Sequence, residues 1–154
     1  MTIEPKSKSS RSWVRDLFTG LYAWLIGFIL YLIPAFVVAI PMGFDLGPKI
    51  RDSVEVGRLI SKAVSELYQS SLYLHYAYII VSAGLVFWRS HATSDRSALK
   101  STAHGVVVST FPVILIAIPF ATGGHFLACV IAIVLLLSAG IIGAKWKGPA
   151  QLAQ

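Results

Sequence analysis

The four histidines are the residues of this chain whose type and placement could support redox or metal chemistry. His75 and His91 bracket the apolar run LHYAYIIVSAGLVFWRSH, while His104 and His125 flank the apolar stretch that follows. Imidazole is a common axial ligand of haem iron. An outer pair, His75 with His125, and an inner pair, His91 with His104, would be the arrangement of a two-haem b-type cytochrome.

Helical phase argues against this haem interpretation. His91 follows His75 by sixteen positions, which at about 100° per residue places them about 160° apart around one helix. Both side chains cannot then face a single bundle axis unless the helix ends before His91. Histidines beside Tyr73, Tyr76 and Tyr78 are also typical of the aromatic belts at membrane surfaces. We therefore predict no metal and no cofactor, and keep a b-type haem protein as the alternative.

A second candidate for chemistry is the loop HATSDRSALKSTAH, in which His91, Asp95 and His104 could form a hydrolytic or metal-binding cluster. Three residues on a polar loop are weak grounds, so we favour an exposed, solvated loop. Cys129 is the only cysteine, so the chain has no CxxC redox pair. It also lacks a glycine-rich phosphate loop and the GxSxG and HExxH motifs. The sequence therefore predicts a protein that is not an enzyme.

Composition places these residues in a membrane protein. Hydrophobic residues make up 56% of the chain and charged residues only 13%, whereas soluble domains carry about 25% charged residues. A helix needs about 17 to 25 apolar residues to cross a bilayer. Four stretches qualify: 17–40, 71–88, 105–121 and 126–143. The predicted fold is all-α and polytopic, with four transmembrane helices in a membrane domain of residues 17–143. We interpret the first stretch as a retained helix, because its 24 uncharged residues exceed the apolar region of a signal peptide.

Charge predicts the orientation of these helices. Residues 1–16, 89–104 and 144–154 together contain nine basic and three acidic residues, whereas residues 41–70 contain four of each. Because cytoplasmic loops are enriched in Lys and Arg, the first three segments are predicted to be cytoplasmic. The chain would be a multi-pass protein of the inner (cytoplasmic) membrane with both termini inside. The basic excess follows from topology alone, so we predict no nucleic-acid partner.

The extracytoplasmic segment 41–70 is predicted to begin with a loop, PMGFDLGP, and to continue as an amphipathic helix from about Pro48 to Gln69. Apolar residues recur there at the spacing of one helix face. They are Val56, Leu59, Ile60, Ala63, Val64 and Leu67. No Gly or Pro separates this helix from the second span, so it either continues as one rod or bends at Ser70 and Ser71. Its apolar face would dock a partner or pack on the protein's own loops.

A polar stripe is predicted along the second span. Ser71, His75, Tyr78 and Ser82 lie three or four positions apart, and polar side chains inside a membrane usually face other helices. None of the four predicted spans contains Asp or Glu. Because an intramembrane acid is the usual group for proton or cation coupling, a coupled transporter is disfavoured.

These observations predict a non-catalytic subunit or scaffold of a membrane assembly, such as a secretion, conjugation or respiratory complex. Its partners would be the lipid bilayer and either other membrane subunits or further copies of the chain. Besides the b-type haem protein, an oligomeric pore remains an alternative, suggested by prolines in the spans and by small residues at 139, 140, 143 and 144.

Overall fold

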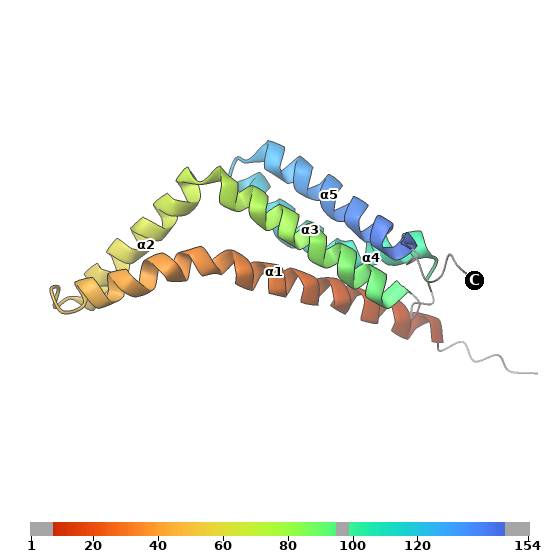
Figure 1. Ribbon diagram of the computed structural model, residues 1–154, viewed down its shortest axis with the longest axis horizontal. Coiled ribbons are helices and arrows are strands. Elements are labelled where there is room, and N and C mark those ends of the chain that lie inside the picture. Colours follow the sequence, from red (N-terminus) through yellow and green to blue (C-terminus); the bar gives the residue numbers. More distant parts are fainter. Residues whose placement is uncertain (1–7, 95–98, 147–154) are drawn as a thin grey trace, which may run out of the picture. The chain divides into compact units, whose positions relative to one another are not determined.

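The computed structural model describes residues 8–94 and 99–146, and these form helices joined by short connections (Figure 1). The helices are α1 (Lys8–Leu46), α2 (Ser53–Ser70), α3 (Leu72–Ser94), α4 (Ser101–Thr122) and α5 (Phe126–Lys145). Two compact units can be distinguished. Unit 1 contains residues up to Gly27 and from Ile79 onward, and unit 2 contains Phe28–Tyr78.

Helix α1 is longer than the sequence predicted. It continues through Pro34 and Pro41 to Leu46, so the predicted loop at 41–48 is wrong for most of its length. A proline inside a helix forfeits one N–H bond, but it leaves the turns on either side able to form their own bonds. The chain turns at residues 47–49 instead, where the Lys49 and Ile50 amides donate to the Leu46 carbonyl.

The junction between α2 and α3 is a break rather than a continuous rod. Asp52 caps the start of α2, because its side chain accepts a hydrogen bond of 2.9 Å from the Val54 amide. At the other end the Ser71 amide donates to the Leu67 carbonyl, and the axis turns by 76° before α3 begins. The bend predicted as one option at Ser70 and Ser71 is therefore confirmed.

Helices α4 and α5 form an antiparallel hairpin in unit 1. Their connection is Gly123–His125, within which Gly124 has a φ of 78°, a left-handed conformation that favours glycine. A methyl group placed on Gly105 would overlap the backbone of Gly140, so the two helices approach closely enough for backbone contact. Gly140, one of the small residues of the last predicted span, thus lies at a close helix contact.

Glycines also set the other helix contacts of unit 1. A methyl group on Gly20 of α1 would overlap the Val108 carbonyl of α4. One on Gly143 of α5 would overlap the backbone of Phe87 in α3. Because each added carbon would meet backbone rather than a flexible side chain, these contacts demand glycine, as in tightly packed membrane helices.

Unit 2 contains the second half of α1, α2 and the first turns of α3. The Tyr68 hydroxyl of α2 donates a hydrogen bond to the Tyr31 carbonyl of α1. The Tyr31 ring lies 4.8 Å from the Tyr68 ring and 4.4 Å from the Tyr78 ring, measured between centroids. This aromatic cluster joins the three helical segments of the unit.

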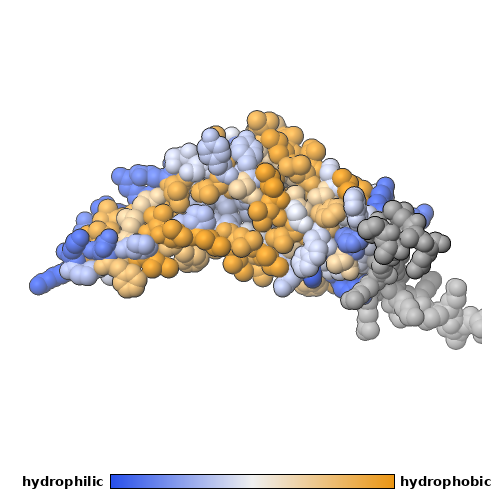
Figure 2. Space-filling model, in the orientation of Figure 1, coloured by the Kyte–Doolittle hydropathy of each residue, from blue (hydrophilic) through white to orange (hydrophobic). Residues whose placement is uncertain are grey.

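The helices are apolar enough for a membrane protein. Three could cross a bilayer by length and composition: Trp13–Leu46, Ser101–Thr122 and Phe126–Lys145. The bent pair α2 and α3 would make a fourth crossing if it counts as one span. On the face drawn in Figure 2, hydrophobic side chains cover much of the helical surface. Exposed large residues such as Phe18, Val37 and Leu127 are 61%, 66% and 67% accessible, as expected for side chains that contact lipid.

Candidate functional site

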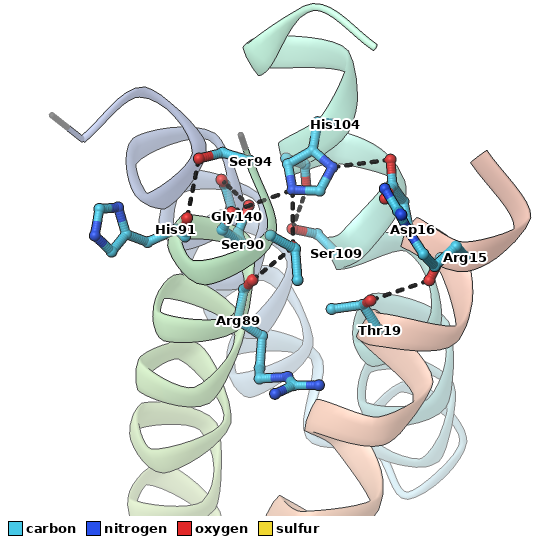
Figure 3. Close-up of polar contacts among 12 residues, drawn as sticks. Arg15, Asp16, Thr19, Arg89, Ser90, His91, Ser94, His104, Ser109 and Gly140 are labelled. Atoms are coloured by element: carbon cyan, nitrogen blue, oxygen red, sulfur yellow. Dashed lines mark hydrogen bonds and ion pairs between the residues drawn. The ribbon is translucent and has the colours of Figure 1, made fainter. Parts of the chain in front are cut away.

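A fully buried pair of ionisable side chains joins α1 to α4. The Oδ2 atom of Asp16 lies 2.9 Å from Nδ1 of His104, and neither side chain has any exposed surface. Figure 3 shows the two groups facing each other between the helices. A carboxylate and an imidazole are seldom buried unless they neutralise and hydrogen-bond each other.

The second nitrogen of His104 is also occupied. Its Nε2 lies 3.1 Å from the Ser90 carbonyl and 3.2 Å from the Thr93 hydroxyl, both on α3. The Thr93 hydroxyl donates its proton to the Arg89 carbonyl at 2.7 Å, so it accepts from the ring. Both ring nitrogens therefore face acceptors.

Serine hydroxyls extend these polar contacts to α5. The Ser90 hydroxyl donates to the Gly140 carbonyl at 2.8 Å, and the Ser109 hydroxyl donates to the Leu136 carbonyl at 2.9 Å. Both serines are fully buried. The network of Asp16, Ser90, Thr93, His104 and Ser109, called the buried polar network below, thus connects α1, α3, α4 and α5 of unit 1 (Figure 3). Hydrogen bonds and the Asp16–His104 ion pair thus link side chains and carbonyl groups of four helices.

Asp16 was not among the residues singled out from the sequence. Asp16 immediately precedes the predicted span 17–40, and α1 continues through it, so the candidate span Trp13–Leu46 includes this acidic residue. A signal was nevertheless present. Asp16 shares one helix face with Thr19, Gly20 and Ala23, all of them buried and spaced by three or four positions. Because the predicted span was taken to begin with the first residue after Asp16, this shared helix face was not recognised.

The predicted polar stripe occupies inward positions. His75, Tyr78 and Ser82 have 9%, 8% and 1% of their surface exposed, whereas Ser71 is partly exposed. His75 and Tyr78 contribute to unit 2, where the His75 ring lies edge-on to Tyr31 with centroids 6.2 Å apart. Ser82 belongs to unit 1 and packs against Gly27 of α1. Within unit 1, the Ser82 hydroxyl has no hydrogen-bond partner among the described residues, so it is not part of the buried polar network.

The predicted docking face on α2 is partly covered by the protein itself. Its six apolar positions are neither buried nor fully exposed: Val56, Leu59, Ile60, Ala63, Val64 and Leu67. No residue of α2 is buried. Some of the cover comes from α1 within unit 2, since a methyl group on Gly43 would lie 3.9 Å from the Ile60 side chain. The charged residues Arg58, Lys62 and Glu66 are exposed.

The structure separates the four histidines by role. Both nitrogens of His104 are engaged by protein acceptors, so neither points to an iron atom. His91 lies on the last turns of α3 with Nδ1 buried, and His125 precedes the first residue of α5. Asp95, the third member of the predicted loop cluster, lies outside the described residues. No group of three or more potential metal-ligating side chains occurs within the described part of the chain.

Comparisons with known proteins add no relative. The chain matches no protein-family model, and no curated protein and no solved structure is significantly similar to it.

Proposed function

We propose that this chain is a small multi-pass protein of the cytoplasmic membrane that serves as a non-catalytic subunit or scaffold of a membrane assembly. The observation that carries the proposal is the complete burial of the Asp16–His104 pair between helices. Its carboxylate and both ring nitrogens are directed to partners on other helices, so the pair ties α1, α3 and α4 together. A pair enclosed between helices in this way maintains a packing arrangement, and neither side chain is exposed to a substrate.

The geometry of unit 1 supports four crossings with both termini on the cytoplasmic side. The buried polar network joins Asp16 near the start of α1, Ser90 near the end of α3, His104 at the start of α4 and Gly140 near the end of α5. Helices that cross in alternating directions bring these four ends to one side. The excess of basic residues in the adjoining segments assigns that side to the cytoplasm.

The proposed interaction element is α2, an amphipathic helix on the extracytoplasmic side. Its charged residues are exposed, while its apolar face is only partly covered. The exposed Lys62–Glu66 pair, with 3.8 Å between nitrogen and oxygen, contributes little by itself. The apolar remainder therefore offers the area that another membrane subunit, or a second copy of the chain, would cover.

The proposal is tested by charge substitution on the two faces of α2. Leu59→Asp with Val64→Asp would bury unpaired charge in the interface, which costs several kcal/mol, on the order of 3 to 5. This variant is expected to lose co-purifying membrane subunits in mild detergent. Arg58→Glu with Lys62→Glu changes the exposed face and should leave association nearly intact.

Two measurements keep this test interpretable. Carbonate extraction shows whether each variant still inserts in the membrane, and a thermal melt shows whether α2 still packs on α1. A Leu59 and Val64 double variant that is stable, inserted and accompanied by every wild-type partner would refute the docking role of α2.

A further inference from the structure

Helix α3 carries one arginine, Arg89, and its guanidinium lies between two aromatic rings. Its Cζ atom is 4.9 Å from the centroid of Tyr22 in α1 and 5.5 Å from that of Trp88. These distances are within the range of cation–π attraction. Figure 3 shows the guanidinium extending from α3 toward α1, away from His104.

This cation has no anionic partner within the described residues. Its Nε atom is buried without a hydrogen-bond acceptor. Among the described residues of unit 1, Asp16 is the only acidic one, and it is paired with His104. A buried N–H donor without an acceptor is costly, so the position favours an anion supplied from outside the chain.

The neighbouring aromatic side chains indicate the depth in the membrane at which that anion would lie. Tyr22 and Trp88 are 50% and 54% exposed and Arg89 is partly exposed, so the three side chains lie near the outer surface of the helices. Trp13 lies near the start of α1 and Trp146 directly follows the end of α5. Their side chains are 47% and 55% exposed. Tryptophan and tyrosine gather at the headgroup region of membranes.

We infer that Arg89, with Tyr22 and Trp88, forms a binding site for the phosphate of an anionic phospholipid on the cytoplasmic leaflet. A guanidinium presents two parallel donors that match phosphate oxygens. Basic pockets between membrane helices on the cytoplasmic side are a known way of holding anionic headgroups. The inference rests on the proposed membrane insertion, but it does not depend on any protein partner.

The test uses the purified full chain in detergent, with native mass spectrometry of bound phosphatidylglycerol and phosphatidylcholine. The wild type is expected to bind phosphatidylglycerol more tightly. Arg89→Gln should weaken that binding at least about tenfold, the loss expected for a charge-assisted hydrogen bond. Lys145→Gln removes one exposed charge at the same end and should weaken it less than about fivefold.

Further arms distinguish the alternatives. Tyr22→Leu keeps the cation and should weaken binding about two- to fivefold, through loss of one cation–π contact, so the inference stays testable if Arg89→Gln fails to fold. Displacement of the lipid by millimolar inorganic phosphate would identify a free-phosphate site instead. Equal losses for Arg89→Gln and Lys145→Gln, or no preference for phosphatidylglycerol, would overturn the inference. Arg89-dependent retention of a protein with lipid binding unchanged would assign the cation to a partner's carboxylate and also overturn it.

Failure of this test is separable from failure of the proposed function. Lipid binding is measured on the isolated chain, whereas the scaffold proposal depends on partners that co-purify through α2. A chain that binds phosphatidylglycerol at Arg89 but has no α2-dependent partner would retain the inference and lose the scaffold role.

Discussion

The Asp16 carboxylate lies 2.9 Å from the His104 imidazole, and both side chains are completely enclosed by the helices of unit 1. Asp16 immediately precedes the uncharged run of the first predicted span, and His104 lies in the first turn of α4. Their meeting fixes which helices are neighbours at this end of the unit.

Removing Asp16 should destabilise the protein strongly. Asp16→Ala leaves the buried imidazole without its charge partner, and breaking a buried pair in this way costs about 3 to 5 kcal/mol. Denaturation of the purified protein in mixed detergent micelles measures the loss. Glu66→Ala breaks the exposed Lys62–Glu66 pair and should cost about 0 to 1 kcal/mol. Equal effects of the two substitutions would contradict the structural role of Asp16.

Glycine substitutions should discriminate close helix contacts from open positions. Gly105→Ala places a methyl group against the backbone of Gly140 and Ile141, so it should cost about 1 to 3 kcal/mol, as overpacking does. Gly84→Ala on α3 meets nothing within 4 Å and should be neutral or stabilise the helix by up to about 1 kcal/mol. Thermal unfolding followed by circular dichroism compares the two. A neutral Gly105→Ala would argue against the tight α4–α5 contact.

Reporter fusions should place both termini and the α3–α4 connection on the cytoplasmic side. Fusions after residue 94 and after residue 146 are expected to be active with a cytoplasmic reporter, and fusions at 47–52 with a periplasmic one. The reason is the basic excess of the first set of segments together with the shared end of α1, α3, α4 and α5 in the buried polar network. A periplasmic reporter active after residue 146 would refute this topology.

The tyrosine contact in unit 2 should contribute measurably to stability. Tyr68→Phe removes the hydroxyl that donates to the Tyr31 carbonyl while it keeps the ring, so a loss of about 1 kcal/mol is expected. Tyr73 is 86% exposed, and Tyr73→Phe should have no effect. Local opening of α2, followed by hydrogen exchange of its amides, provides the measurement. If exchange rates in α2 were the same in both variants, the hydrogen bond would have no role in holding the helix.

Some boundaries of the apolar helices were predictable from the sequence, and others were not. The predicted start of the last span at Phe126 agrees with α5, and the bend near Ser71 was one of two options. The end of the first span was not predictable, because Pro41 and Gly43 are ordinary loop signals. A helix can nevertheless continue through them when its turns remain satisfied on both sides. Helix boundaries depend on this balance and not on residue type alone.

By itself, the sequence determined that the chain is all-helical and apolar enough for a membrane, and that its charge is unevenly distributed. These properties follow from local composition and from the cost of leaving backbone groups unsatisfied in lipid. The tertiary structure alone decided that Asp16 meets His104, that Ser90 reaches the Gly140 carbonyl, and that Arg89 lies between Tyr22 and Trp88. Each of these contacts depends on the rotation of a helix about its own axis and on the choice of its neighbour. Both are set by where glycines permit backbones to touch, a relationship between distant segments that no local pattern contains.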